Sequence, residues 1–230
     1  MPDMELLRRH MRSSVLSPQS VILDMGDAIT RAYFPYTGAV SLVVVLSSGQ
    51  MIETAMVGRD GMVGGSAAFD AQPAASSRAI VQLQGAAWVI DAELLRQMAS
   101  ARPDVQTLLL RHERVLFAQT QQISACNASH SLEARLCRWL LRASDACGKT
   151  TLATTQESIA EILGVRRTSI CLVAHHLQQA GHIRTRRGQI ELLDLAALRQ
   201  GACECYARTA MQYDRLLTRA TPPVDDFRMA

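Results

Sequence analysis

The chain has 230 residues, 48% of them hydrophobic, and a formal net charge of +3. This length has room for two domains that each bury a core, and so small a net charge does not by itself indicate a nucleic-acid partner. The longest apolar run, from Val40 to Leu46, is too short to span a bilayer, and the N-terminus lacks a charged-then-apolar signal. We therefore expect a cytoplasmic protein with no membrane partner.

The first hundred residues have the pattern of a β-domain. An amphipathic helix is expected around Met4 to Met11, and short β-type segments follow at residues 21–23, 31–34, 39–46, 51–57, 79–84 and 86–90. Turn signals such as Ser47-Ser48-Gly49 separate them, and several short strands at this spacing predict a barrel or sandwich. We assign residues 1–102 to this first domain.

A β-barrel could also belong to a small-molecule-binding protein or to a cupin-like enzyme, which holds its metal with closely spaced histidines and a carboxylate. The strand region contains no histidine, because His10 precedes it and the others follow it. No constellation of nucleophile, base and acid replaces that metal centre. We therefore expect no catalysis.

A long helix is predicted over residues 103–129, because apolar or neutral residues recur there in alternating steps of four and three. The stripe consists of Val105, Leu109, His112, Leu116, Gln119, Ile123 and Cys126. It has two interpretations. It forms a coiled-coil seam, or it packs, together with Leu108 and Val115, against its own β-domain.

Residues 130–197 predict a helix-turn-helix followed by a hairpin. Ser131 is a candidate cap for a helix that begins at Leu132, and a short helix is expected from about Thr155 to Leu163. Gly164 supplies the turn, and a second helix is expected from about Arg167 to Gln179. Residues 182–193 then alternate around a glycine turn, which is typical of a β-hairpin.

The arginines of this segment also have two interpretations: they are a solvated charged face, or they contact DNA. Arg166 and Arg167 stand with Thr168 and Ser169 at the start of the second helix, and three more arginines lie in the hairpin. A helix N-terminus that enters the major groove needs such side chains, and a basic hairpin suits the phosphate backbone. The combination favours DNA binding.

These residues resemble the winged helix of the CRP/FNR family of bacterial transcription regulators. The matching segments are Thr155-Gln156-Glu157, Ile159-Ala160, Leu163-Gly164-Val165, Arg167-Thr168-Ser169, Gly181-His182-Ile183 and Gly188-Gln189-Ile190-Glu191-Leu192-Leu193-Asp194. The resemblance implies an α+β fold with an N-terminal double-stranded, jelly-roll-like β-roll over residues 1–102, a long dimerisation helix over 103–129 and a C-terminal winged helix-turn-helix over 130–197.

It further implies a homodimer that binds a palindromic operator in double-stranded DNA, and RNA polymerase as a partner if the protein is an activator. The residues expected to face bases are Arg167, Thr168, Ser169 and Leu172, and those expected to hold phosphates are Arg166, Thr155, Gln156, Arg184, Arg186 and Arg187. The expected dimer interface consists of Leu109, His112, Leu116, Gln119 and Ile123. Thr168 and Leu172 stand where cyclic-AMP-responsive members have glutamate and arginine, so we expect a different operator.

The candidate effector-binding residues are Gly64, Gly65, Ser77 and Arg78. Cyclic-AMP-responsive members hold the ribose with a glutamate, where this chain has Gly65. They hold the cyclic phosphate with an arginine, where this chain has Ser77, and Arg78 comes one residue late. We therefore expect no cyclic-AMP binding of the usual kind, and the sequence names no effector or cofactor.

Residues 198–230 are expected to contain part of an additional helix over 195–217 and a disordered tail over 222–230. Six cysteines are present, and none precedes Cys126, so the N-terminal cysteine cluster of FNR-type iron–sulfur sensors is missing. Cys126, Cys137, Cys147 and Cys171 fall in predicted helices as small core or boundary residues. Cys203 and Cys205 are placed on the last helix, where residues two apart face away from each other, so no metal site is predicted.

Overall fold

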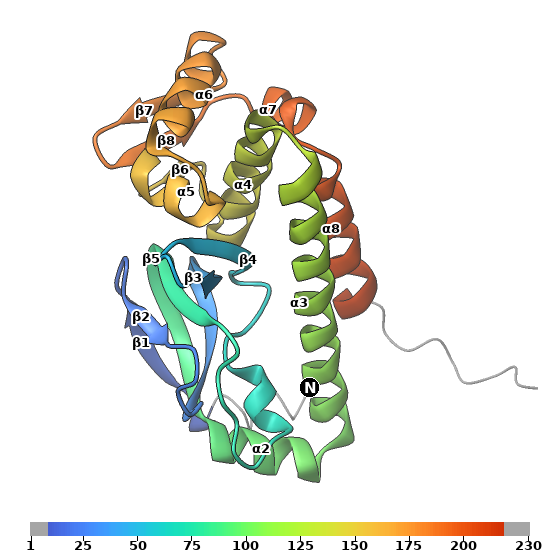
Figure 1. Cartoon of the computed structure of the whole chain (residues 1–230). Coiled ribbons are helices and arrows are strands. Elements are labelled where there is room, and N and C mark those ends of the chain that lie inside the picture. The colour runs from blue at the N-terminus through green and yellow to red at the C-terminus, as the bar shows by residue number, and fades with distance from the viewer. Residues whose placement is uncertain (1–8, 219–230) are drawn as a thin grey trace, which may run out of the picture.

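The computed structural model describes residues 9–218. It has an N-terminal antiparallel β-domain, a long helix, and a C-terminal helical domain with a small sheet (Figure 1). The predicted α+β class is confirmed. The tail expected at 222–230, and most of the helix expected around Met4 to Met11, lie outside the described residues.

Five antiparallel strands form the β-domain. They are β1 (Arg12–Leu16), β2 (Val21–Leu23), β3 (Arg31–Val45), β4 (Met51–Val57) and β5 (Arg78–Asp91). The order is β1-β5-β3-β4, with β2 also paired to β5. Apolar side chains fill the interior, among them Leu16, Val40, Val57, Val63, Ala79, Val81 and Ala87. Their burial removes apolar surface from water, which is the main stabilisation of such a roll.

Two pairs of expected short strands are each one long bent strand. Segments 31–34 and 39–46 join as β3, and segments 79–84 and 86–90 join as β5. The bend occurs where Gly38, at φ +79°, crosses Gly85, whose Cβ would lie 2.1 Å from the Thr37 carbonyl oxygen. Glycine permits this close approach and the register shifts beside it, so the strands bend instead of ending.

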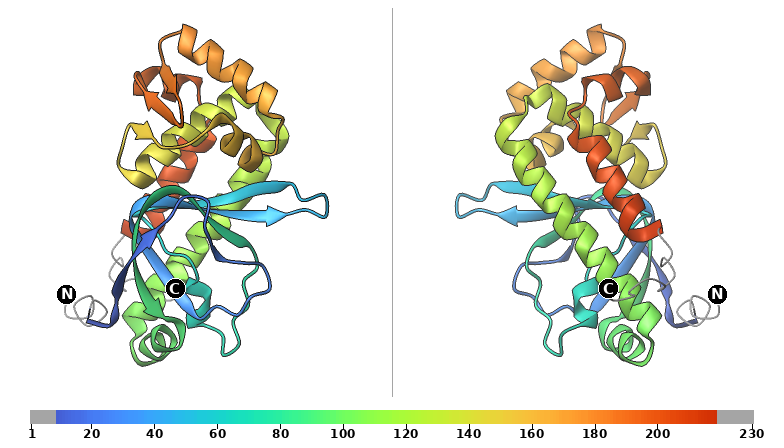
Figure 2. Two further views of the ribbon diagram at one scale, coloured as in Figure 1. Left: turned by 90° about the vertical axis from the view of Figure 1, so that its left-hand side faces the viewer. Right: turned by 90° about the vertical axis from the view of Figure 1, so that its right-hand side faces the viewer.

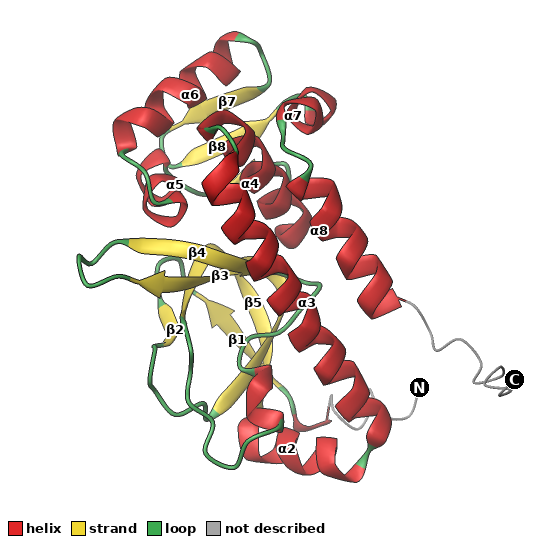
Figure 3. Ribbon diagram, turned by 45° about the vertical axis from the view of Figure 1, so that its right-hand side comes forward, coloured by secondary structure: helices red, strands yellow, loops and turns green. Residues whose placement is uncertain are grey.

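Two helices follow β5 and lead out of the β-domain, and a short 3₁₀ turn lies between β4 and β5. The short 3₁₀ turn η1 (Gly65–Ala68) packs on α2 (Ala92–Ala101), whose N-cap Asp91 accepts hydrogen bonds from the amides of Glu93 and Leu94. Pro103 is the first residue of α3 (Pro103–Ser129). A backbone N–H at this position has no intrahelical partner, so proline, which lacks the N–H, costs the helix no hydrogen bond. The helix α3 runs along the β-domain and reaches the C-terminal domain (Figure 3).

The C-terminal domain begins with α4 (Leu132–Cys147), where the Ser131 hydroxyl caps the amide of Ala134 at 3.3 Å. Next come β6 (Thr151–Leu152), α5 (Gln156–Leu163), α6 (Arg167–Gln179), β7 (Ile183–Arg186) and β8 (Gln189–Leu192). The sheet order is β6-β8-β7. β6 was not predicted, because two residues are too few to show an alternating pattern.

The helix expected over residues 195–217 is interrupted. It consists of α7 (Leu195–Gly201), α8 (Cys205–Tyr213) and the π-helical turn η2 (Asp214–Thr218). Asp194 caps α7 through the amide of Ala197, and α8 packs along α3 (Figure 1). The connection between α7 and α8 allows Cys203 to turn toward Cys126, a contact that no local pattern indicates.

The two domains contact each other directly. Helix α5 lies on β4, and the Ser158 hydroxyl accepts hydrogen bonds from Gln82 at 2.7 Å and Gln19 at 3.0 Å. One apolar core continues from Val43 and Met56 of the β-domain into α4 and α5. Figure 2 shows the C-terminal domain seated on one end of the β-domain. The β-domain therefore contacts the helix-turn-helix on the side formed by α5, away from α6.

Candidate nucleic-acid interface

Local signals position the turn of the helix-turn-helix. The Thr155 hydroxyl accepts a hydrogen bond from the Ser158 amide at 3.1 Å, which caps the first turn of α5. Gly164 ends α5 in the left-handed conformation, at φ 67°, and the Val165 amide bonds back to the Ala160 carbonyl. This turn directs the chain into α6 at Arg167.

Helix α6 has one buried and one exposed face. Ile170, Ala174 and Leu177 are buried against the domain core, whereas Leu172 is 58% exposed. Arg166, Arg167 and Thr168 are also exposed, and Ser169 is half-buried. Within residues 9–218, no side chain caps the N-terminus of α6, and its first turn contains no acidic residue. Its free amides and the helix dipole therefore favour an anion such as a phosphate.

The hairpin β7–β8 is the wing. Gly188, at φ 73°, makes its turn, and Arg186 and Arg187 are exposed at the tip. Arg184 is paired across the strands with Glu191, at 3.1 Å between Nη1 and Oε2. The positive charge available to a partner is therefore concentrated at the tip.

A surface cavity of 430 Å³ separates the wing from the start of the helix-turn-helix. Its lining includes Thr155, Gln156 and Arg167 on one side and Arg186 and Arg187 on the other. Glu157 lies 3.8 Å from Arg167, but both side chains are about two-thirds exposed, so this contact is weak. The structure thus brings five of the residues predicted to contact DNA onto one concave surface.

Comparisons with known proteins match both domains. The model of the Crp-like helix-turn-helix domain covers residues 134–200, and the model of the cyclic nucleotide-binding domain covers residues 14–102. The transcriptional regulator SdrP of Thermus thermophilus is 30% identical over 172 residues, which are 74% of this chain and 83% of SdrP. The chain belongs to the CRP/FNR family of transcription regulators.

Solved structures of other CRP/FNR proteins have the same fold. FixK2 of Bradyrhizobium japonicum superposes with a TM-score of 0.70 at 15% identity, covering 84% of this chain and 98% of its own. The c-di-GMP-responsive global regulator CLP of Xanthomonas campestris superposes with a TM-score of 0.65 at 19% identity, covering 84% and 99%. None of the helices within residues 9–218 combines the length and hydropathy needed to cross a bilayer.

The residues expected at the CRP/FNR dimer interface lie inside a single chain. Leu109, His112, Gln119 and Ile123 are each at most 5% exposed, and Leu116 is half-buried against the interior of the β-domain. His112 Nε2 accepts a hydrogen bond from the Met62 amide at 3.0 Å. Within one chain the apolar stripe covers the β-domain and α8, which is the second of its two interpretations, and the interface between two copies stays a prediction.

A different face of α3 is exposed. Leu110 is 47% exposed and Phe117 is 66% exposed, and these two residues lie seven positions apart on the same side of the helix. Leu108, which was expected to pack on the β-domain, is 45% exposed on the opposite side, whereas Val115 is buried as expected.

Among the candidate effector residues, Arg78 is engaged by an ion pair within the chain. The Arg78 guanidinium forms two hydrogen bonds to Asp24, at 2.8 and 2.7 Å, and thereby lowers the pKa of that carboxyl group. Gly64, at φ +81°, precedes η1, and a Cβ at Gly65 would lie 2.2 Å from Met62 Cε. Ser77 is half-buried just before β5. Sequence reasoning missed Asp24, because an ion pair between residues 54 positions apart leaves no local signal.

Proposed function

We propose that this CRP/FNR-type regulator works in the cytoplasm as a homodimer that reads a two-fold-symmetric DNA operator. The N-terminal turn of α6 enters the major groove in each half-site, and half-site centres lie about 10 base pairs apart. The observation that carries the proposal is the concave surface on which α6, the start of α5 and the wing tip present exposed cationic and polar side chains.

The exposed side chains suggest a division of roles. Arg167, Thr168, Ser169 and Leu172 read bases, and Ser169 has the shortest reach because it is half-buried. Arg166, Thr155, Gln156, Arg184, Arg186 and Arg187 hold the phosphate backbone. Among the wing arginines, Arg184 contributes least because Glu191 already pairs with it.

The exposed face of α3 supports the homodimer. Two large apolar side chains, Leu110 and Phe117, point away from the chain's own core at heptad spacing. Pairing of this face with its copy in a second chain removes both from water and sets the two recognition helices about a two-fold axis. RNA polymerase is a further partner if the regulator activates transcription.

The contacts around Gly65 and Arg78 argue against the binding of cyclic AMP in the family's usual site. A buried cyclic phosphate needs a charge-assisted partner, and the Arg78 guanidinium is already engaged by Asp24. Glutamate at position 65 would need the space of Met62. The β-domain therefore responds to another signal or to none.

Selection of bound duplexes from a random DNA pool tests the proposal. The purified full-length protein is incubated with the pool alone, with cyclic AMP, and with c-di-GMP in separate arms. We expect a palindrome that is recovered equally with and without cyclic AMP. Recovery without any enriched sequence would contradict sequence-specific binding, and recovery only with cyclic AMP would contradict the interpretation of Gly65 and Arg78.

A further inference from the structure

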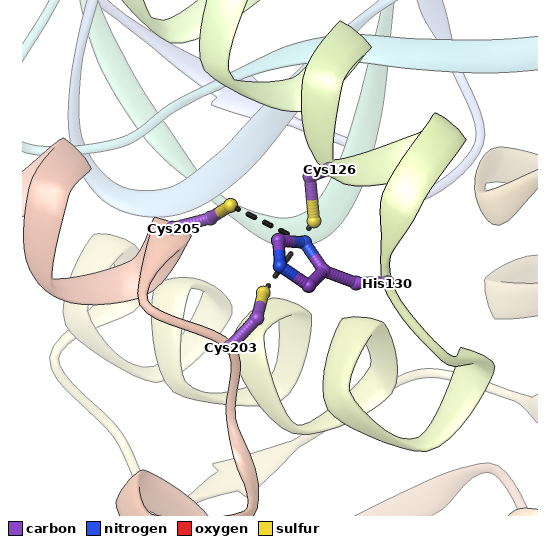
Figure 4. A group of neighbouring side chains, drawn as sticks. All are labelled: Cys126, His130, Cys203 and Cys205. Atoms are coloured by element: carbon purple, nitrogen blue, oxygen red, sulfur yellow. Dashed lines mark hydrogen bonds between the residues drawn. The ribbon is translucent and has the colours of Figure 1, made fainter.

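Four side chains with metal-binding atoms converge where α3, α4 and the α7–α8 connection meet. They are Cys126 in the last turn of α3, His130 between α3 and α4, Cys203 before α8, and Cys205 at its first position (Figure 4). One ligand atom from each lies within 4.8 Å of all the others. The Sγ atoms of Cys126 and Cys203 are 3.5 Å apart, and Cys205 Sγ is 3.6 Å from His130 Nδ1.

The separations of 3.5 and 3.6 Å match the edges of a tetrahedron around one metal ion. With Zn–S bonds of about 2.3 Å and Zn–N bonds of about 2.0–2.1 Å, tetrahedral geometry places neighbouring ligand atoms roughly 3.6–3.8 Å apart. An iron–sulfur cluster has several atoms between its cysteine ligands and needs wider spacing. Three thiolates and one imidazole form a ligand set that selects Zn²⁺. We propose that Cys126, His130, Cys203 and Cys205 bind one zinc ion.

Neighbouring groups orient these ligands. His130 Nε2 lies 3.1 Å from Glu204 Oε2, so the ring donates its Nε2 proton to the carboxylate and leaves the Nδ1 lone pair for a metal. The Gln122 amide donates to Cys205 Sγ at 3.0 Å, as a donor does to a thiolate. A carboxylate that accepts a hydrogen bond from the second ring nitrogen is the outer-shell partner that zinc-bound histidines usually have.

The charge at the cluster is also suited to a metal. Zinc binding releases the three thiol protons to solvent, and three thiolates with Zn²⁺ leave one net negative charge. Arg135 and Arg138 of α4 lie near enough to interact electrostatically with Cys126. Two cationic neighbours therefore stabilise the loaded site.

Packing alone does not account for the convergence. Cysteine is a suitable small apolar residue, and Ala134 completes an apolar cluster with the three thiols. His130, however, turns Nδ1 of its ring into that cluster, where it contacts the Cys205 thiol at 3.6 Å. The sequence places Cys203 and Cys205 on one helix, facing apart. In the structure Cys203 precedes α8, so the two side chains are not fixed on opposite faces of a helix.

The position of the site gives a bound metal ion a structural role. Its ligands come from the end of α3, the α3–α4 junction and the start of the C-terminal helix α8. This is the region where the C-terminal domain connects to the long helix α3. Arg135, four residues beyond the N-cap of α4, donates to the Leu163 carbonyl at the end of α5, at 2.6 Å. A bound ion therefore fixes the orientation of the helix-turn-helix relative to α3.

Metal titration of the full chain tests the proposal without DNA, so its outcome is independent of the operator experiment. The protein is reduced, stripped with a chelator and titrated with CoCl₂ and then ZnCl₂. We expect about one Co²⁺ per chain, with thiolate charge-transfer bands and the visible bands of tetrahedral cobalt, displaced by Zn²⁺. Absence of these bands at excess cobalt, or six equally reactive thiols in the zinc-treated protein, would overturn the proposal.

Variants assign the ligands. Cys126→Ser and Cys203→Ser should lose the charge-transfer bands or bind at least 100-fold more weakly, whereas Cys147→Ser, at a half-buried cysteine outside the cluster, should bind as the wild type does. Circular dichroism verifies that each variant is folded. Glu204→Gln, at a positioning residue, should keep the band positions and weaken cobalt binding about 10- to 100-fold. Equal cobalt affinity in Cys203→Ser and Cys147→Ser would contradict the proposed zinc site.

Discussion

Arg142 of α4 donates a hydrogen bond to Asp60, which follows β4, with 2.7 Å between Nη1 and Oδ2. The Arg142 side chain is only 10% exposed, and it also donates to the Met56 carbonyl oxygen at 2.9 Å. Tyr213 of α8 covers the guanidinium, whose carbon lies 4.9 Å from the ring centroid. One side chain thus connects the β-domain, the DNA-binding domain and the C-terminal helix.

Asp60→Asn should lower the free energy of unfolding by roughly 3 kcal/mol, because the substitution leaves the buried Arg142 charge without its partner. Asp24→Asn is the matched control, since Asp24 and Arg78 form an ion pair near the surface that should contribute little. Urea unfolding measures both variants. Equal losses would show that the Arg142 pair has no special role between the domains.

The same pair predicts a dependence on pH. Burial would raise the pKa of Asp60, but the charge and hydrogen bonds of Arg142 outweigh it, so the pKa lies below the ordinary 3.8. The stabilisation is therefore fully present above pH 3.8 and is lost as the pH falls through the folded-state pKa. The stability difference between wild type and Asp60→Asn should be constant near neutrality and shrink only below that pH. A difference that shrinks already between pH 7 and 5 would contradict this assignment.

Gly164→Ala should destabilise the contact between the domains. A Cβ there would lie 2.2 Å from Ile52 Cδ1, and the left-handed backbone adds a cost of about 1–2 kcal/mol. Gly181→Ala is the control, because its φ is also positive, at 76°, and nothing lies within 4 Å of the added Cβ. We expect a larger loss for Gly164→Ala in urea unfolding, with the excess removed in the background of Ile52→Ala. Equal losses at the two glycines would mean that β4 does not touch the turn in solution.

Phe117→Arg should convert the dimer into monomers, since it places a charge in the apolar face proposed for pairing. Leu108→Arg is the control, because Leu108 is also an exposed apolar residue but lies about 180° around α3. Sedimentation equilibrium measures the masses. A dimer that survives Phe117→Arg but dissociates in Leu108→Arg would place the interface on the other side of the helix.

Arg167→Ala should relax base preference at one position of the half-site and weaken binding by roughly 1–3 kcal/mol. Arg186→Ala should weaken binding to all duplexes alike and flatten the salt dependence. Binding of the selected duplex and of point-substituted duplexes at several salt concentrations separates the two effects. Equal and sequence-independent losses in both variants would contradict the assigned roles.

The winged helix could be predicted from the sequence because its signals are local. The Thr155 cap and Gly164 mark the turn, and α6 runs from Arg167 to Gln179 as expected. The role of the α3 stripe could not be predicted, since a heptad pattern identifies an apolar face but not the surface that covers it. The break before α8 was also missed, because it accompanies a contact between Cys126 and Cys203, 77 residues apart. The assigned DNA contacts remain predictions.

We propose that the exposed start of α6 reads the bases of the operator. A repeat of the random-pool selection with the double variant Thr168→Glu, Leu172→Arg tests it most directly, because these residues restore the side chains of cyclic-AMP-responsive members at two exposed positions. We expect a changed half-site sequence with the same two-fold symmetry and the same spacing, since neither the dimer nor the wing has changed. Recovery of the wild-type operator sequence by the double variant would contradict it.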